Sequence, residues 1–539
     1  MLDIVDVIGK FGTYHALIVL LIMLRAVPTG WTNMITPLIA PKMDHWCARP
    51  PELLLANFSD HEWKTLAVPL TEDGSFSKCE MYLVTIGKEI INVDRNITVA
   101  CQSWEYNTSV YEKTIVNQWD LVCSRSWYRS AAQSVVMAGA LVGVLLLGEM
   151  SDRVGRRPTF FTCVLLILTF GSLSSVAPGI GWFNVGRFML SMGVAGCQAT
   201  TVSLLMEIVP PKHRMMLNLG FGIGYTGSLL LLPLVAYHLN NWSSLQLIAG
   251  LSAIMMIPFW FILQESPRWL LTKGRFEDAE ATIVKVLKIN RRPIPDMDQV
   301  MSDLSLQSKL ESRKTKIRFF DFFRTPNMRR NTCVLFVQWF LGGVIYYYAA
   351  LNVTNIPGNP YINYTVSSAA ELPAALLGMY VVRCWSRRRS MAVQLLLAGL
   401  AFVPAPFLPK GGSPWPRVAC NMLMRFFFLV GGFIKWIMVL EIFPTSARSF
   451  GFACCLTCSR FGAMVAPFLV DLGDATNAII PAVLVVLMNL LTAGLALVLP
   501  ETLNKPLPDN FQEAENIDRN KAPKVNKQEM KHKLKDVPR

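Results

Sequence analysis

Twelve long apolar segments restrict the folds open to this chain. Each is close to the roughly 20 residues that a helix needs to cross a bilayer. Only 16% of the residues are charged, whereas soluble proteins average about 25%. We therefore predict an all-α membrane protein with twelve spans, arranged as six, a gap and six. The segments lie near residues 14–35, 131–150, 159–178, 181–206, 216–238, 245–263, 332–353, 366–384, 391–409, 417–440, 449–470 and 477–499.

Residues 36–130 form one long polar insert after the first span. The insert holds nine Lys or Arg against twelve Asp or Glu. Paired cysteines and Asn-x-Ser/Thr sequons are typical of an oxidising, extracellular compartment, so we expect this insert outside the cell. Its four cysteines allow three disulfide pairings, and the sequence does not choose among them. The candidate disulfide and glycosylation residues are Cys47, Cys79, Cys101, Cys123, Asn57, Asn96 and Asn107.

The loops on the other side are basic. Residues 264–327 hold thirteen Lys or Arg against nine acids. Such loops stay in the cytoplasm, and both termini belong with them. The net charge of +14 therefore reflects topology rather than nucleic-acid binding. The predicted organisation is a cytoplasmic N-terminus and first span at 1–35, the extracellular insert at 36–130, spans two to six at 131–263, a cytoplasmic linker with short helices at 264–328, spans seven to twelve at 329–500 and a largely disordered cytoplasmic tail at 501–539.

One short motif occurs twice. "EIVPPKHR" occupies 207–214, and "EIFPTSAR" follows 234 residues later at 441–448. The dipeptide Arg187–Phe188 recurs as Arg425–Phe426, and Glu265 has a looser counterpart in Glu501. These pairs keep the same order and a nearly constant offset, which indicates two duplicated six-helix halves. Duplicated six-helix halves are an architecture of membrane transporters.

Several motifs carry a family resemblance. "GEMSDRVGRRP", which starts at 148, resembles the loop signature of the major facilitator superfamily. Together with the cysteine-bearing insert, "NQWDLVC", "ESPRWLLTKGRFEDAE", "EIFPTSARSFGF" and "LPETLNKPLPD", it makes roughly residues 1–515 resemble solute carrier family 22. That family comprises organic cation, carnitine and organic anion transporters. The resemblance implies a major facilitator fold and the movement of small organic ions across the plasma membrane by alternating access.

Charged residues cluster at the predicted cytoplasmic span ends. One interpretation is topological, since basic residues retain loops in the cytoplasm. The other is a charge network that clamps the helix ends in one conformation and releases them in another, as alternating access requires. In the second half Ser386 replaces the expected Gly and no acid matches Asp152, so we predict a weaker clamp there or one that relies on Glu441 and Arg448. The predicted gating residues are Asp152, Arg153, Arg156, Arg157, Glu207, Arg214, Glu265, Arg268, Glu441 and Arg448.

The predicted substrate site lies between the halves near the bilayer midplane. Ionisable residues in a span are costly and mark function by default. Structural ion pairing, snorkelling and simple helix packing remain the alternatives for these side chains. The candidates are Arg460, Lys435, Glu371, Tyr347, Tyr348, Trp339, Asn33 and Arg25.

The family resemblance bears on the substrate's charge. Organic anion and carnitine-type members resemble this chain at Arg460, where cation members typically place an Asp. Anion members also tend to carry a Lys in span eight, where this chain has Ala375. We hypothesise that Lys435 supplies the displaced positive charge. Anionic or zwitterionic substrates are therefore favoured, and an organic cation carrier that uses Glu371 and the tyrosines is the rival.

Other functional classes find little support. There is no GxxxxGK[ST] motif for ATP, and neither HExxH nor zinc-spaced Cys/His pairs occur. We expect no enzyme activity, metal or cofactor. The predicted partners are a small organic ion, the lipid bilayer and, if transport is an exchange, a counter-ion. A transporter-like receptor or scaffold without flux is the alternative from another class.

Overall fold

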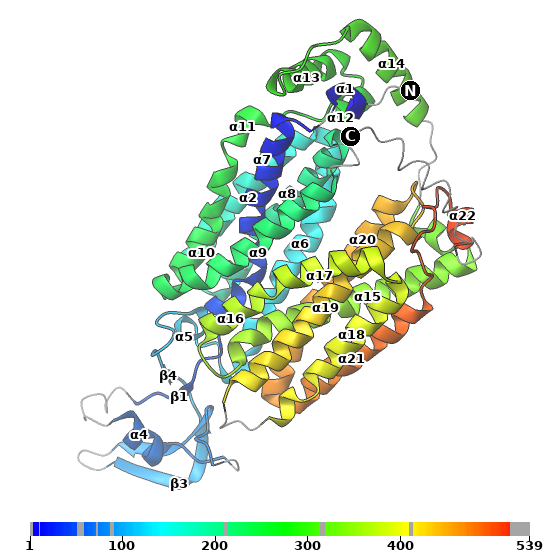
Figure 1. The fold of residues 1–539 in the computed structure, drawn as a ribbon. Helices are drawn as coiled ribbons and strands as arrows, with labels where there is room; N and C mark the ends of the chain where they lie inside the picture. Colours follow the sequence, from blue (N-terminus) through cyan, green and yellow to red (C-terminus); the bar gives the residue numbers. More distant parts are fainter. Residues whose placement is uncertain are drawn as a thin grey trace. The chain divides into compact units, whose positions relative to one another are not determined.

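The computed structural model describes residues 4–9, 11–50, 59–71, 74–86, 91–209, 214–312, 318–408 and 413–517. It divides into two compact units. Unit 1 comprises Met1–Ser312 and Ala350–Ser368, and unit 2 comprises Arg313–Ala349 and Ala369–Arg539. Figure 1 shows both units as bundles of long helices.

Twelve helical stretches among the described residues are long and apolar enough to cross a membrane. The predicted all-α, twelve-span architecture is therefore confirmed. The stretches are Thr13–Met34, Cys123–Val154, Arg156–Ser175, Ile180–Ile208, Gly220–Leu239, Trp242–Ile262, Pro326–Thr354, Pro360–Cys384, Arg387–Phe407, Trp415–Ile442, Arg448–Gly473 and Ile479–Val498.

In unit 1 the long helices pack closely because small residues let their backbones approach. A Cβ on Gly139 would lie 2.3 Å from the carbonyl oxygen of Phe188, so α6 and α8 can meet only through glycine at this point. The helices of this unit are α1 (Ile4–Ile8), α2 (Thr13–Met34), α3 (Thr36–Ile39), α4 (Asp60–Ala67), α5 (Ile115–Gln118), α6 (Trp127–Val154), α7 (Arg156–Ser175), α8 (Ile180–Ile208), α9 (Arg214–Leu239), α10 (Trp242–Leu251), α11 (Phe259–Ile262), α12 (Pro267–Thr272), α13 (Phe276–Ile289) and α14 (Met297–Ser312).

In unit 2, glycines also let the helix backbones approach closely. A Cβ on Gly343 would lie 2.2 Å from the carbonyl oxygen of Ser459, and one on Gly462 would lie 2.0 Å from that of Phe340. These glycines bring α15 and α20 into backbone contact. The remaining helices are α15 (Pro326–Leu351), α16 (Pro360–Ala369), α17 (Glu371–Cys384), α18 (Arg387–Phe402), α19 (Trp415–Ile442), α20 (Arg448–Ala475), α21 (Ile479–Val498) and α22 (Phe511–Glu515), and α16 lies almost wholly in unit 1.

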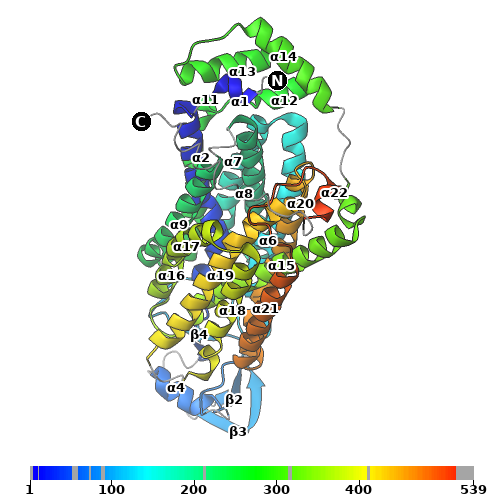
Figure 2. The same ribbon diagram turned by 45° about the vertical axis from the view of Figure 1, so that its right-hand side comes forward.

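Short helices and strands occupy opposite ends of unit 1. Helices α12, α13 and α14 lie with α1 at one end (Figures 1 and 2), and Ile8, Ile283 and Val286 belong to one buried apolar cluster. At the other end β1 (His45–Cys47) pairs with β4 (Trp104–Tyr106), and β2 (Glu80–Ile86) pairs with β3 (Ile91–Ala100), both antiparallel. Two disulfides, Cys47–Cys101 and Cys79–Cys123, join cysteines of this region.

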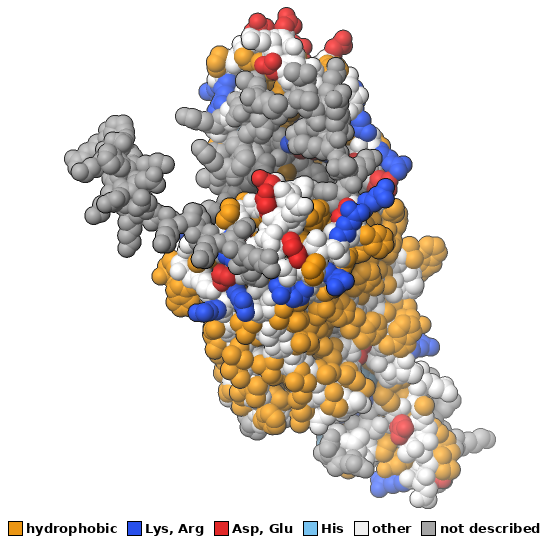
Figure 3. Space-filling view, turned by 90° about the vertical axis from the view of Figure 1, so that its right-hand side faces the viewer, with side chains coloured by type: hydrophobic (Ala, Val, Ile, Leu, Met, Phe, Trp, Pro, Cys, Tyr) orange, Lys and Arg blue, Asp and Glu red, His pale blue; other side chains and the backbone are white. Residues whose placement is uncertain are grey.

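The helical surface is strongly apolar. Figure 3 shows a broad band of hydrophobic side chains on one face, with Lys and Arg gathered along one edge of the band. Leu487 and Leu491 on α21 are about half exposed, and Leu400 on α18 is similar. A soluble protein rarely exposes so continuous an apolar surface, whereas a lipid-facing surface requires it.

Candidate functional site

A buried ion pair lies inside unit 2. Glu371, the first residue of α17, accepts from Nη2 of Arg425 on α19 at 2.5 Å. The Tyr346 hydroxyl donates to the same carboxylate at 3.3 Å. The guanidinium of Arg425 also lies 5.6 Å from the centre of the Tyr346 ring. Glu371 is therefore ion-paired with Arg425, a residue absent from the predicted site.

Arg460 and the tyrosines form a second group in unit 2. Nη1 of Arg460 on α20 donates to the hydroxyl of Tyr347 on α15 at 3.3 Å. Tyr347 is buried, and so is Tyr348, whose ring packs edge-on against Phe402. A guanidinium beside a phenol hydroxyl has donors that suit a carboxylate. The structure thus brings together two of the predicted binding residues.

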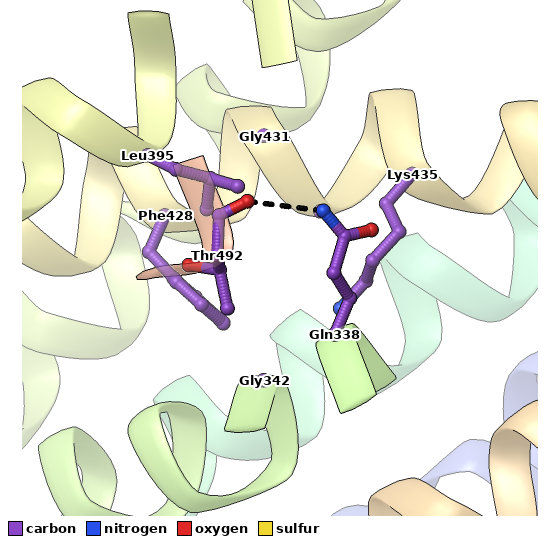
Figure 4. Close-up of a pocket in the computed structure, with 8 residues that line it drawn as sticks. Gln338, Gly342, Leu395, Phe428, Gly431, Lys435 and Thr492 are labelled. Atoms are coloured by element: carbon purple, nitrogen blue, oxygen red, sulfur yellow. Dashed lines mark hydrogen bonds between the residues drawn. The ribbon is translucent and has the colours of Figure 1, made fainter. Parts of the chain in front are cut away.

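Lys435 projects into a small pocket enclosed by α15, α18, α19 and α21 (Figure 4). Its ammonium lies 4.7 Å from the centre of the Trp339 ring. A Cβ on Gly342 would come within 2.6 Å of Nζ, so the glycine makes room for the ammonium. No carboxylate lies within ion-pair distance of Lys435 in the described ranges. The cation instead faces a cavity of about 10 Å³, which has room for about one water molecule.

Unit 1 also holds buried cations. Arg25 on α2 is 2% exposed, and its guanidinium lies 5.0 Å from the centre of the Phe221 ring. Arg187 on α8 is fully buried and donates to Oγ1 of Thr36 at 2.8 Å. Neither pairs with an acid among the residues that the structure describes. Asn33, also buried, accepts at its backbone oxygen from Gln133.

The first carboxylate cluster, made of Asp152, Arg156, Glu207 and Glu265, joins four helix ends of unit 1. Nη2 of Arg156 lies 2.7 Å from Oε1 of Glu207 and 3.0 Å from Oδ1 of Asp152. Glu265 accepts from the backbone N–H of Arg156 at 2.9 Å, and from that of Arg157 at 3.1 Å. A carboxylate at the start of α7 stabilises the helix dipole as well as its free N–H groups.

The turn into α7 explains which arginine pairs with the acids. Gly155 has φ of +126°, and a Cβ there would lie 2.5 Å from Oε2 of Glu265. This turn directs Arg156 toward Glu207, whereas Nη2 of Arg157 donates to the carbonyl oxygen of Trp260 at 2.7 Å. Both arginines are predicted gating residues, and Arg156 is the one that forms ion pairs with Glu207 and Asp152.

The second carboxylate cluster, made of Ser386, Arg387, Glu441 and Glu501, repeats this arrangement in unit 2. Glu501 accepts from the backbone N–H of Arg387 at 3.1 Å, and also from the Ser386 hydroxyl. Arg387 forms an ion pair with Glu441. One predicted alternative was a clamp that relies on Glu441 and Arg448. Arg448, which begins α20, donates to Oγ1 of Thr445 at 3.1 Å. Burial raises the pKa of Glu501, yet these hydrogen bonds outweigh it and hold that pKa below its ordinary value.

The remaining predicted residues are mostly exposed. Arg153 is exposed and pairs with Glu149, and Arg268 is exposed on α12. Asn96 and Asn107 are exposed, as glycosylation acceptors must be. The side chain of Arg214 and the whole of Asn57 lie outside the described residues.

The sequence interpretation missed several residues that the structure brings to these sites. Arg187 and Arg425 were noted as repeat markers, although a charged residue in a span is itself a functional signal. Glu501 was likewise noted only as a counterpart of Glu265. Arg387 is one of three consecutive arginines, and nothing in the run singles it out. Gln338, which lines the Lys435 pocket, is a single uncharged residue, and no sequence pattern marks it as functional.

Comparison with known proteins decides the family. The model of the "Sugar (and other) transporter" family matches residues 91–512. A Drosophila melanogaster protein named organic cation transporter protein is 30% identical over 98% of this chain and 96% of its own length. This chain belongs to solute carrier family 22. Organic anion transporter 3 of Oryctolagus cuniculus, another member, is 30% identical over 95% of this chain and 93% of its own length.

The solved structures agree on the fold. The partially occluded, inward-open xylose transporter XylE from E. coli superposes with a TM-score of 0.61 at 14% identity, over 91% of this chain and 99% of that one. At this identity the likeness shows the major facilitator fold alone. Family and fold together make the protein a transporter of organic ions rather than an enzyme.

Proposed function

We propose that this protein carries small organic anions or zwitterions across the plasma membrane by alternating access. The supporting observation is an excess of cations inside the helical bundles. Arg25, Arg187 and Lys435 meet no carboxylate in the part of the chain that the structure describes. Charge in a membrane interior is costly unless it is compensated. An anionic substrate would supply that compensation.

Arg460 and Tyr347 are the proposed carboxylate donors. Their 3.3 Å contact places a fork of N–H groups beside a hydroxyl. Both kinds of donor can bind the oxygens of one carboxylate. Trp339, Tyr348 and Lys435 extend this proposed binding surface along α15 and α19. In unit 1, Asn33 and Arg25 are separately proposed as substrate contacts.

Cation transport is the second candidate. Glu371 and Tyr346 offer a carboxylate and an aromatic face, and one relative is named as an organic cation transporter. However, Arg425 already neutralises Glu371 at 2.5 Å. A cationic substrate would have to displace Arg425 from Glu371, and breaking one side of a buried ion pair costs about 3–5 kcal/mol.

The two carboxylate clusters are the proposed gates. In this proposal they lie on the cytoplasmic side with both termini, whereas the strands, disulfides and sequons of residues 36–130 lie outside. An ion-paired cluster can stabilise one conformation and separate in another, which is the bistable element that alternating access needs.

Arg460→Ala tests the substrate assignment. We expect carboxylate uptake by expressing cells to fall roughly tenfold to a hundredfold, because charged hydrogen bonds contribute about 1.5–3 kcal/mol. Arg275→Ala, which removes an exposed arginine, is the matched control and should leave uptake unchanged. Unchanged carboxylate uptake by Arg460→Ala at normal surface expression would refute the assignment. Preloading the cells with unlabelled carboxylate separates exchange, which it accelerates, from uniport.

A further inference from the structure

The imidazole of His45 lies beside the Cys79–Cys123 disulfide, at the end of unit 1 that carries β1 and β4 (Figure 1). Nε2 of His45 lies 4.0 Å from Sγ of Cys123, and this nitrogen and both sulfurs lie within 4.8 Å of one another. In a tetrahedral zinc site, bonds of about 2.3 Å to sulfur and about 2.0 Å to nitrogen set such atoms roughly 3.5–3.8 Å apart. The fold therefore brings three possible zinc ligands together, although no sequence spacing marks them.

The orientation of His45 suits a metal ligand. Nδ1 lies 3.0 Å from the backbone oxygen of Met43, and since a carbonyl can only accept, Nδ1 carries the proton and Nε2 keeps its lone pair. The ring lies 6.0 Å from that of Tyr106, its partner across the β1–β4 pair. Burial lowers the pKa of His45, so the imidazole is neutral at physiological pH. Histidines that bind zinc are usually held in this way through their other nitrogen.

The two disulfides of this region differ in exposure. Cys47 is fully buried and Cys101 is 8% exposed, whereas Cys79 and Cys123 are both half-buried. Thiol–disulfide exchange needs access to a sulfur, so exposed disulfides are the labile ones. A dithiol that attacks such a bond becomes a disulfide itself, and its two electrons and two protons leave the two cysteines as thiols. Cys79–Cys123 is therefore the pair that we expect reduction to open first.

Reduction turns this cluster into a set of zinc ligands. We propose that the reduced chain binds one Zn²⁺ through the sulfurs of Cys79 and Cys123 and through Nε2 of His45, with water in the fourth position. Each thiol gives its proton to the solvent as its sulfur coordinates, so two thiolates balance the charge of the ion. Thiolate and imidazole are ligands that zinc prefers. The nearby ammonium of Lys78 is compensated by Asp44 at 2.7 Å.

Alkylation of the two cysteines tests the site in the full chain. The protein, purified in detergent, is treated with a water-soluble phosphine, which takes an oxygen atom from water, becomes the phosphine oxide and leaves two thiols. Iodoacetamide is then added with or without zinc chloride, and peptide mass spectrometry gives the alkylation rate at each cysteine. We expect saturating zinc to slow alkylation of Cys79 and Cys123 roughly tenfold or more, because only the metal-free chain reacts.

His45→Phe is the decisive variant, because it keeps a ring beside Tyr106 but has no nitrogen to bind zinc. The zinc concentration that gives half-protection should rise roughly tenfold or more, since losing even an outer-shell partner typically costs about 10–100-fold in metal affinity. His61→Phe is the matched control, because His61 is an exposed histidine on α4. It should leave half-protection unchanged. Where His45→Phe does not yield folded protein, His45→Leu replaces it.

Three results would overturn the proposal: equal alkylation with and without zinc, half-protection of His45→Phe at the wild-type zinc concentration, or reduction of Cys47–Cys101 before Cys79–Cys123. The second result would identify any zinc on the thiols as an adventitious ion only. These outcomes are separate from the proposed function, because no candidate substrate residue takes part in the site. Absent carboxylate flux in cells would refute anion transport and would leave the zinc measurement unaffected.

Discussion

The two carboxylate clusters both cap the start of a helix, but they do so with different residues. In both, a glutamate from the end of its unit's helical bundle, Glu265 or Glu501, caps the start of a helix through backbone N–H groups. The first cluster adds a third acid, Asp152, and needs a glycine at its turn. The second has Arg383 in the place of Asp152, and its Ser386 donates to the capping glutamate. Both clusters therefore share the cap and one ion pair, while the third acid is particular to the first half.

The largest expected difference comes from removing each central arginine. Arg156→Ala leaves Glu207, whose side chain is 17% exposed, without this ion-pair partner, and it also removes the ion pair with Asp152. Breaking one side of a buried pair costs about 3–5 kcal/mol. Arg387→Ala removes only the ion pair with Glu441, so the loss in thermal stability should be smaller. Melting temperatures in one detergent measure both losses, with the exposed Arg153→Ala as control. A larger loss in Arg387→Ala would contradict the assignment of the third acid to the first cluster.

The turn residues should differ next. Gly155→Ala forces a Cβ into a φ of +126° and against Glu265, which costs about 1–3 kcal/mol. Ser386 has φ of −54°, an ordinary value, so Ser386→Ala loses only one hydrogen bond, about 1 kcal/mol. Thermal unfolding of the two variants ranks them. Equal melting temperatures would show that the turn at Gly155 is not strained by a side chain.

Acid should weaken the second cluster through Glu501. The folded-state pKa of Glu501 lies below its ordinary value, which is about 4.3 for an unfolded chain. Its contribution is therefore complete above that ordinary pKa and is lost as the pH falls through the lower, folded-state pKa. Glu501→Gln should remove this part of the acid-dependent loss. A melting-temperature profile against pH that is identical in wild type and variant would contradict the assignment.

The smallest effect should come from restoring the missing acid. Arg383 is exposed and lies four residues before Arg387, the spacing of Asp152 and Arg156. Arg383→Asp should therefore add an ion pair and stabilise by less than about 1 kcal/mol, since Asp152 is largely exposed too. An unchanged or slightly raised melting temperature is the result expected for a weak, exposed ion pair. A marked decrease would show that Arg383 has its own structural role.

Charge and hydrophobicity predicted the coarse features of the molecule well. The twelve spans follow from segment length alone, and the duplicated Glu207 and Glu441 motifs located both clusters. The individual partners did not follow, because they depend on side-chain direction at a turn. Arg156 and Arg157 are adjacent in sequence, and only the backbone at Gly155 separates their roles. Ser386 was expected to weaken its cluster for lack of glycine, yet its hydroxyl supplies a donor that glycine lacks.

The candidate binding residues show the same limit. Arg460 and Lys435 were predicted because ionisable groups in spans are rare. Their neighbours Tyr347 and Trp339 also followed from the aromatic pattern of α15. Which carboxylate holds which cation depends on how α15, α17 and α19 pack, and the sequence alone could not assign Glu371 to Arg425. Gln338 needed the structure because one amide among many apolar residues is indistinguishable from a packing residue.

Paired flux of an anion and a cation tests the central claim most directly. Cells that express the wild type are given labelled benzoate or labelled benzylamine, which is a cation at neutral pH and of similar size. We predict saturable benzoate uptake above that of cells lacking the protein, with little uptake of benzylamine. Saturable benzylamine uptake without benzoate uptake would contradict the claim and would favour the cation carrier built on Glu371.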